Sequence, residues 1–425
     1  METHNTLKKR KVICFDGWTE GCIHFERHVE AFRNAGFEMI LVHYGSWGHD
    51  KGRPKEESIG KLLVRDISYY SNSLLKILND ERPDIVLFLS TRNFINMAFN
   101  RYAKFLGVPT CLIYHGLISV QDTTLGDSNP YKFSKLRYLT LIRERMGKNL
   151  TVLIPKYLYS MAYTKASLSV WVEALSLIRE RVTGRWTQNH YADSSTDFGC
   201  IWAQIDTEHM ADLYRIPKSR IFIIGNPDLL KFNVKSSDVL SCYTNISLGY
   251  RQVVYIETAF NDTGVVYSDD LEFIHAMVVL KEELATYSFD FKLKLHPANN
   301  SKKELLDGLM KNDVEVVSDN DFIKQLKMSA GAIVEPSSAV IVPCILGLPI
   351  YFNNIGSMRS IPFGDMLHSY PNSTTLNTMS DLALICTNIE NASYADYNEW
   401  INLYIGSVSA EDISTKLLNA IRHFC

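Results

Sequence analysis

FKLKLHP at 291–297 and EPSSAVIVPCILGLPIYF at 335–352 decide the fold of this chain. Each places polar side chains where an apolar strand ends: His296 in the first stretch, and Ser337 and Ser338 in the second. In an open parallel α/β sheet, ligands bind outside the carboxyl ends of the strands. The two stretches therefore predict one pocket, and its imidazole and hydroxyl groups are suited to phosphate.

The chemistry of these residues favours an anion. An imidazole can donate a hydrogen bond to a phosphate oxygen, and Pro297 restricts the backbone directly after His296. Ser337 and Ser338 stand at the start of a helix predicted over 338–346, whose first N–H groups attract negative charge. The alternative is that the serines cap this helix and bind no ligand.

The same alternation of short apolar strands and amphipathic helices extends over the rest of the chain. It predicts βαβ units in two doubly wound sheets, covering 1–235 and 236–425. The strands expected from the apolar runs are 12–15, 38–43, 85–89, 110–114, 200–203, 221–224, 253–258, 291–295, 314–317, 331–334 and 349–352. The helices expected between them are 23–35, 67–79, 94–106, 206–214, 270–286, 303–310, 322–328 and 338–346. The expected fold class is α/β, with two Rossmann-like domains facing a cleft.

Composition excludes several classes of protein. The 425 residues are 46% hydrophobic and 21% charged, with a formal net charge of −3, so nothing attracts the whole chain to nucleic acid. The eight cysteines contain no C-x-x-C, and several lie in apolar runs, which indicates buried thiols and no zinc site; these include Cys14, Cys111, Cys344 and Cys386. No stretch approaches the roughly 20 apolar residues of a membrane span, and KKRK at 8–11 lacks the apolar segment of a signal peptide. A cytoplasmic location is expected.

A basic segment, about 130–186, interrupts the first domain. Residues 132–185 hold eleven Lys or Arg against three Glu, an excess of eight positive charges, and aromatic residues lie between them. Such a helical segment can lie on an anionic membrane surface or hold an anionic polymer. The alternative is a pair of ordinary helices with solvated basic faces.

Four parts of the sequence resemble one family. They are VVYIETAF at 253–260, KLHP at 294–297, EPSSA at 335–339 with LGLPIYF at 346–352, and IWAQIDTEHMADLYRIPKSRIFIIGNPD at 201–228. These are similar to GT-B glycosyltransferases that build bacterial capsule and lipopolysaccharide, above all the CMP-sialic acid and CMP-Kdo transferases. The CDP-glycerol glycerophosphotransferases of teichoic acid synthesis resemble the chain nearly as well.

The resemblance implies a function and a nucleotide site. A His-Pro and a Ser-Ser motif bind the phosphate and ribose of a cytidine nucleotide in that family, and His296, Pro297, Ser337 and Ser338 match them. The implied activity moves a sugar from a CMP-linked donor to an oligosaccharide or lipid-linked glycan, without metal or other cofactor. The protein would then contact the inner membrane face peripherally. The implied alternatives are a CDP-glycerol-type transferase and, with less support, a UDP-sugar 2-epimerase.

The catalytic base is assigned to the first strand. The bacterial sialyltransferases carry an acidic-acidic-glycine motif, whereas the nearest match here, FDGWTEG at 15–21, has a single acid before its glycine. Asp16 and Glu20 follow this strand on the loop expected to face the nucleotide donor, so one of them is the predicted base. The alternative is that Asp16 shapes the turn and Glu20 caps the next helix.

Four further residues complete the predicted site. His115 and Gly116 follow the strand at 110–114, where the histidine would orient the acceptor and the glycine would allow close approach of the backbone. Glu257 and Thr258 follow the strand at the start of the second domain and are expected to contact the nucleotide donor. A 2-epimerase would close the phosphate site with Ser-Gly-Gly in place of Ser-Ser-Ala, and a scaffold protein would not need polar strand ends in both domains.

Overall fold

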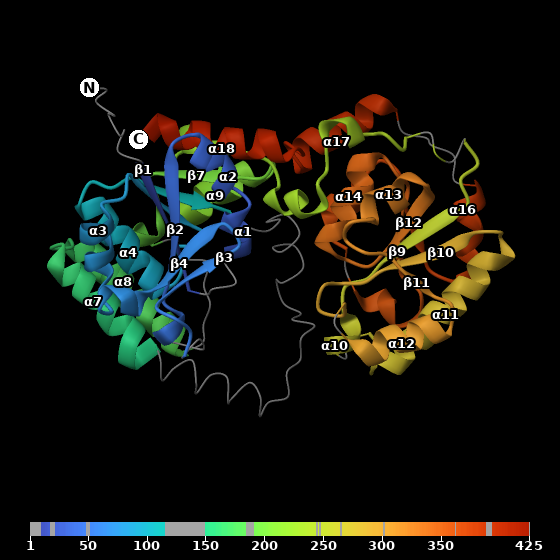
Figure 1. Cartoon of the computed structure of the whole chain (residues 1–425), viewed down its shortest axis with the longest axis horizontal. Helices are drawn as coiled ribbons and strands as arrows, with labels where there is room; N and C mark the ends of the chain where they lie inside the picture. The colour runs from blue at the N-terminus through green and yellow to red at the C-terminus, as the bar shows by residue number, and fades with distance from the viewer. Residues whose placement is uncertain are drawn as a thin grey trace, which may run out of the picture. The chain divides into compact units, whose positions relative to one another are not determined.

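The computed structural model describes residues 10–17, 22–47, 52–114, 149–183, 191–243, 245, 248–263, 266–300, 302–361, 363–387 and 393–424. The chain divides into two compact units (Figure 1). Unit 1 comprises Met1–Gly116, Phe133–Pro227 and Glu411–Cys425, and unit 2 comprises Leu117–Lys132 and Asp228–Ala410. Each unit is built on its own sheet with helices on both faces, which confirms the predicted α/β class.

The sheet of unit 1 has eight strands in the order β3-β4-β2-β1-β5-β6-β7-β8. The strands are β1 (Arg10–Asp16), β2 (Phe37–His43), β3 (Glu56–Ile59), β4 (Leu62–Asp66), β5 (Ile85–Phe88), β6 (Thr110–Ile113), β7 (Phe198–Ile201) and β8 (Ile221–Ile223). All neighbours pair in parallel except β3 and β4, an edge hairpin that the sequence patterns did not predict. The chain runs from β1 outward to β2 and later returns to β5 on the other side of β1, so the strand order reverses between β1 and β5.

Two helical layers enclose this sheet (Figure 1). The helices of unit 1 are α1 (Cys22–Glu26), α2 (Val29–Asn34), α3 (Leu74–Glu81), α4 (Phe94–Phe105), α7 (Ile154–Tyr163), α8 (Leu168–Thr183), α9 (Asp206–Tyr214) and α18 (Ala410–Phe424). One core cluster joins α3, α4, α7, α8 and α9 to the side chains of β1, β2 and β5 that face them. The sequence placed 411–425 in the second domain, but α18 packs on unit 1: Phe424 stacks on Phe198 at 4.2 Å between ring centroids. His28 Nδ1 and Ser414 Oγ lie 3.0 Å apart in the same contact.

The structure describes only 149–183 of the basic segment. Tyr157, on α7, is a core residue whose hydroxyl donates to Asp193 Oδ2 at 2.8 Å, so it is not available to a membrane. Tyr159 and Leu168 are 63% and 80% exposed on the outer side. Helix α7 therefore packs one face on α4, and both α7 and α8 carry exposed apolar side chains. In the described part of the chain, no helix is long and apolar enough to cross a membrane.

The sheet of unit 2 is parallel throughout its described strands, in the order β11-β10-β9-β12-β13-β14. The strands are β9 (Gln252–Ile256), β10 (Asp290–Lys294), β11 (Glu315–Val316), β12 (Ser329–Val334), β13 (Ile350–Asn353) and β14 (Ser373–Leu376). The chain leaves β9 toward β10 and β11, then crosses to β12 on the other side of β9. The topological switch point, where α/β sheets bind ligands, therefore lies between β9 and β12.

Helices α11 (Asp270–Thr286) and α12 (Lys303–Lys311) cover one face of this sheet, and α13 (Phe322–Lys327) and α14 (Ile341–Leu346) cover the other (Figure 1). The shorter helices are α10 (Phe260–Thr263), α15 (Asp365–His368), α16 (Leu384–Thr387) and α17 (Tyr394–Tyr404). The helix predicted over 338–346 begins instead with a 3-10 turn, Ser338–Val340, and becomes α-helical at Ile341. Pro343 explains the late start, because a proline has no N–H to donate to the carbonyl of Ala339.

The cysteines follow the predicted pattern with one exception. Cys14, Cys111 and Cys344 are buried thiols, as their apolar surroundings indicated. Cys386 was expected to be buried for the same reason, but it is exposed, because α16 is a single short turn at the surface.

Candidate functional site

Two buried glutamates mark the switch point of unit 2. Glu257 directly follows β9 and Glu335 directly follows β12, and their side chains are 2% and 0% exposed. Val334 pairs with Ile256 in the sheet register, and the Glu335 N–H donates to the Ile256 carbonyl at 3.0 Å. The two carboxyl groups therefore leave adjacent strands at the same level of the sheet.

Glu335 joins three segments of unit 2. Its Oε1 accepts hydrogen bonds from the hydroxyls of Tyr255 at 2.6 Å and Tyr267 at 3.4 Å. Its Oε2 accepts one from the Thr258 N–H at 2.8 Å. The Tyr255 hydroxyl in turn accepts from Asn353 Nδ2 at 2.8 Å, so β9, β12 and β13 are connected through this one carboxyl group.

Glu257 fixes the loop that carries the His-Pro motif. Its Oε2 accepts from the His296 N–H at 2.6 Å, and its Oε1 accepts from Asn299 Nδ2 at 2.7 Å and from the Ala259 N–H. Ala259 has a positive φ of 61°, so the backbone turns sharply directly after Thr258. The carboxylate of Glu257 thus holds the segment after β10 against the end of β9.

Burial changes the protonation of Glu335. Desolvation raises the pKa of this carboxyl to about 8, and the nearby Glu257 carboxylate acts in the same direction. The hydrogen bonds from Tyr255, Thr258 and Tyr267 act in the opposite direction and do not offset burial. Glu335 is therefore mainly neutral at pH 7.

The predicted phosphate ligands lie around these two carboxyls. His296 is half-buried, and its Nδ1 accepts from the Ala298 N–H at 3.2 Å, which leaves the ring proton on Nε2. Ser337 is half-buried, two residues beyond Glu335, and its hydroxyl accepts from the Ala339 N–H at 3.3 Å. Thr258 Oγ1 is buried with no hydrogen-bond partner among the described residues. The structure thus brings Glu257, Thr258 and His296 together, while the side chain of Ser338 lies outside the described part.

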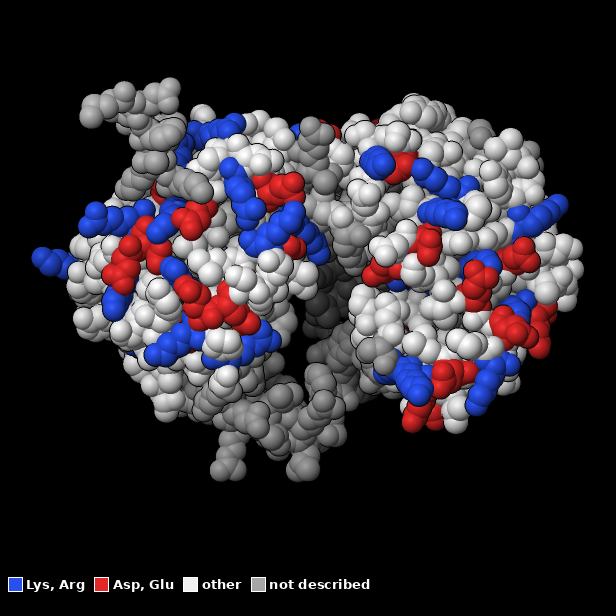
Figure 2. Space-filling model, in the orientation of Figure 1, with Lys and Arg blue, Asp and Glu red and all other residues white. Residues whose placement is uncertain are grey.

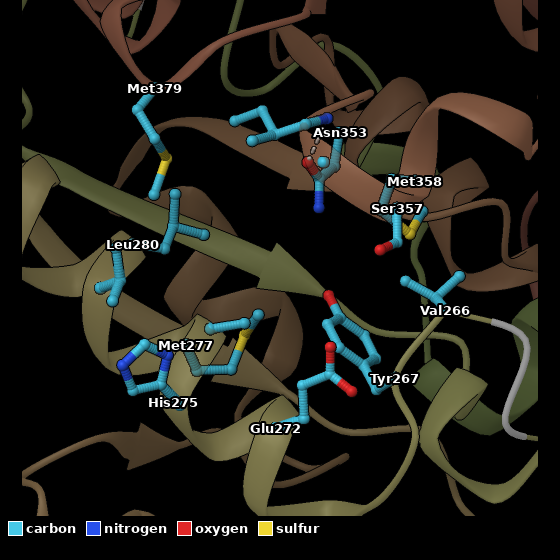
Figure 3. Close-up of a pocket in the computed structure, with 14 residues that line it drawn as sticks. Val266, Tyr267, Glu272, His275, Met277, Leu280, Asn353, Ser357, Met358 and Met379 are labelled. Atoms are coloured by element: carbon cyan, nitrogen blue, oxygen red, sulfur yellow. Dashed lines mark hydrogen bonds between the residues drawn. The ribbon is translucent and has the colours of Figure 1, made fainter.

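A pocket of about 300 Å³ adjoins this cluster (Figure 3). Tyr267 and Asn353 belong to both, and Figure 3 shows the Tyr267 hydroxyl directed toward the middle of the pocket. The remaining lining residues are mainly apolar and come from α11, the segment before it and the segments after β13 and β14: Val266, Glu272, His275, Ala276, Met277, Val279, Leu280, Ile355, Gly356, Ser357, Met358 and Met379. A mostly apolar pocket with a few polar groups is the usual form of a small-molecule site.

The carboxyl edge of unit 1 holds Asp16 at the end of β1. Its Oδ1 accepts from the Gly17 N–H at 2.6 Å. The Tyr44 ring lies against this turn, since a Cβ on Gly17 would meet the Tyr44 hydroxyl at 2.9 Å. Burial and the charge of Asp16 raise the pKa of Tyr44, whose hydroxyl donates to Asn93 Oδ1 at 3.1 Å. The predicted site residues Glu20, His115 and Gly116 lie outside the described residues.

Comparison with known proteins supports the fold assignment. A variant of the wall teichoic acid polymerase TagF superposes with a TM-score of 0.50 at 12% identity, covering 98% of this chain and 89% of that one. The chain has the GT-B fold. MnaA of S. aureus with UDP gives 0.49 at 12% identity, covering 98% of this chain and 96% of that one. A putative UDP-N-acetylglucosamine 2-epimerase from Listeria monocytogenes gives a TM-score of 0.46 at 13% identity, covering 98% of this chain and 97% of that one. No family model and no curated protein matches the sequence.

Sequence reasoning missed most of the cluster in this GT-B chain. Glu335 was quoted within its motif but was given no role, and Tyr255, Tyr267 and Asn353 were not singled out. One signal was available for Glu335, because an ionisable residue directly after a fully apolar strand is unusual unless it is paired. Nothing local marks the two tyrosines, which read as ordinary core residues.

Proposed function

We propose that this chain is a transferase that takes its donor group from a cytidine nucleotide, with a CMP-linked sugar as the preferred donor and a surface glycan as the acceptor. The observation that carries the proposal is the arrangement at the switch point of unit 2, where His296, Thr258 and Ser337 surround the ends of β9, β10 and β12. The resemblance of the His-Pro and Ser-Ser motifs to CMP-sugar transferases supports the cytidine nucleotide.

In this proposal the residues of unit 2 hold the phosphate. His296 offers its imidazole, and the Thr258 and Ser337 hydroxyls are further hydrogen-bond donors. Preorganised donors of this kind stabilise the negative charge that grows on a departing phosphate. Glu257 acts indirectly, because its carboxylate accepts from two N–H groups of the loop that carries His296 and from the Ala259 N–H after β9.

The acceptor hydroxyl needs a general base, and the proposal assigns this to Asp16 or Glu20 in unit 1. A carboxylate at the carboxyl end of β1 is on the edge of the sheet where α/β proteins place reacting groups. Asp16 is half-buried at this edge, so water can reach it.

A CDP-glycerol-type glycerophosphotransferase is the second candidate. The superposition with TagF, a wall teichoic acid polymerase, favours it, and TagF has also been captured with CDPG. A UDP-sugar 2-epimerase has less support, because Ser337-Ser338-Ala339 stands where that class has Ser-Gly-Gly. The three candidates differ in the nucleotide they bind, so a ligand panel separates them.

The experiment is calorimetric titration of the full chain with CMP, CDP and UDP, in wild type, His296→Ala and His275→Ala. A charge-assisted contact to phosphate contributes roughly 1.5–3 kcal/mol, so His296→Ala should weaken the cytidine nucleotides about tenfold or more. His275→Ala is the matched control, because this histidine lines the adjoining pocket and not the His-Pro loop. Unchanged CMP and CDP affinity in His296→Ala would refute the proposed site. A loss of nucleotide affinity confined to His275→Ala would instead place the nucleotide in the adjoining pocket.

The proposal includes peripheral contact with an anionic membrane through the segment 130–186. Figure 2 shows acidic and basic side chains interspersed over the described surface of both units on the face in view, so this face has no extended basic patch that competes with the segment. Replacing four arginines by glutamine should reduce sedimentation with anionic vesicles at low salt and leave neutral vesicles unaffected. The four are Arg143, Arg145, Arg179 and Arg181. If wild type and variant sediment alike, the helices are ordinary solvated ones.

A further inference from the structure

Glu335 is the most deeply buried acid in the described part of the nucleotide site, and the proposed function gives it no contact with ligand. Its side chain is 0% exposed and joins Tyr255, Thr258 and Tyr267. The chain continues from it through Pro336 directly to the proposed phosphate ligand Ser337. Any change in the charge or position of this carboxyl therefore affects the phosphate-binding segments on both sides of the switch point.

The groups that face Glu335 do not compensate a negative charge. Strand β9 and the loop after it contribute Tyr255 and the Glu257 carboxylate, and the segment before α11 contributes Tyr267. Burial raises the pKa of both tyrosine hydroxyls. β13 contributes the neutral amide of Asn353. On the neighbouring strand, the His296 N–H is bonded to Glu257. The buried cation of β10, Lys294, pairs with Asp319 at 2.8 Å and donates to the Leu295 carbonyl at 2.8 Å.

We propose that Glu335 is a positioning residue that must carry its proton when an anionic ligand binds at His296 and Ser337. The inference rests on the proposed function of that edge. As a neutral acid, Glu335 still accepts from the Thr258 N–H and stays in contact with the two tyrosine hydroxyls, so it fixes the site without adding charge. As a carboxylate, it would stand beside Glu257 and close to the bound phosphate, and like charges repel strongly in a site with little water.

Protonation and ligand binding are then linked. The affinity measured above the pKa of Glu335 is reduced by the fraction of protein that has lost this proton. With a pKa of about 8, CMP affinity should fall about 30-fold between pH 7 and pH 9.5. The phosphate of CMP does not contribute to this fall, because its second pKa is roughly 6 and it stays doubly charged over the range. By reciprocity, CMP binding near pH 8.5 should take up a proton.

The pocket supplies a route by which this buried acid reaches equilibrium with solvent. The Tyr267 hydroxyl contacts Glu335 Oε1 and also points into the pocket (Figure 3). A proton can therefore pass between the pocket and Glu335 through one phenol. Glu335 can thus be titrated in the folded protein.

The test is titration of the full chain with CMP, CDP and UDP at pH 7, 8 and 9.5, repeated with CMP near pH 8.5 in buffers of different ionisation enthalpy. The variants are Glu335→Gln, which mimics the neutral acid, Glu335→Ala, which removes it, and Glu304→Gln, an exposed control on α12. Wild type and Glu304→Gln should lose about 30-fold in affinity and take up a proton on binding. Glu335→Gln should keep affinity at pH 7 within about threefold, with no fall at pH 9.5 and no proton uptake, whereas Glu335→Ala should bind weakly at every pH.

Each outcome decides the inference. A fall in affinity that is the same in wild type and Glu335→Gln, or no fall in wild type, overturns the role of Glu335 and leaves the proposed function standing. If UDP binds with the expected pH dependence and CMP and CDP do not bind, the role of Glu335 is supported and the assignment of a cytidine nucleotide is overturned. No binding of CMP, CDP or UDP at any pH overturns both.

Discussion

Replacing Glu335 by glutamine should make the stability of this protein less dependent on pH, independently of any ligand. Burial raises the pKa of Glu335 from 4.5 to about 8. Between these values the folded protein keeps a proton that the unfolded chain releases, so the folded state binds more protons. Stability is then fully present below about pH 4.5 and is lost as pH rises to about 8. The amide of Glu335→Gln does not titrate, so the variant lacks this loss.

The magnitude follows from the size of the shift. One pKa unit corresponds to about 1.4 kcal/mol, so the shift from 4.5 to about 8 amounts to about 5 kcal/mol as an order of magnitude. The side chain is 0% exposed, so solvent screening does not reduce this figure. A loss of this size is comparable with the whole net stability of many domains, which is about 5–15 kcal/mol. The free energy of unfolding of Glu335→Gln, taken relative to that of wild type, should therefore rise by several kcal/mol between pH 5 and pH 8.5.

The assay is urea unfolding of wild type, Glu335→Gln and the exposed control Glu304→Gln at pH 5, 7 and 8.5, followed by tryptophan fluorescence and circular dichroism. Two probes are needed because two compact units can unfold separately. The control should stay parallel to wild type at all three pH values. If the difference between Glu335→Gln and wild type does not change with pH, Glu335 is not a buried neutral acid and the reasoning is refuted.

Three further predictions concern other parts of the chain. Of Asp16→Asn and Glu20→Gln, one should lower turnover about 10²–10⁴-fold with unchanged affinity for the nucleotide donor, and full activity in both would place the base elsewhere. Tyr157→Phe should destabilise unit 1 by about 1–3 kcal/mol in urea unfolding, because it removes the hydroxyl that donates to Asp193 Oδ2 and leaves only the Arg101 contact at Oδ1; an unchanged midpoint would contradict this. Gly331→Ala should lower the melting temperature, because its Cβ would lie 2.7 Å from a buried tyrosine ring, and a melting temperature equal to that of wild type would show that β12 can shift.

Local sequence patterns were sufficient for the architecture. The apolar runs at 12–15, 253–258 and 331–334 are of strand length, and helical periodicity lies between such runs, so alternating parallel strands followed directly. His296 and Ser337 were placed at strand ends because a polar residue after a buried strand stands at the carboxyl edge of a parallel sheet. The edge hairpin of β3 and β4 escaped this reasoning, because its strands are short and only half-buried and carry no continuous apolar run.

The sequence by itself determined the fold class, the strand ends and the residue types available for phosphate, since these depend on neighbours a few positions away. Only the tertiary structure decided that Glu335 meets Tyr255, 80 residues earlier, and Tyr267, 68 residues earlier. It also decided that the pKa of Glu335 is raised. A carboxyl loses its hydration according to everything that packs around it, and that packing exists only once β9, β12 and the segment before α11 have come together.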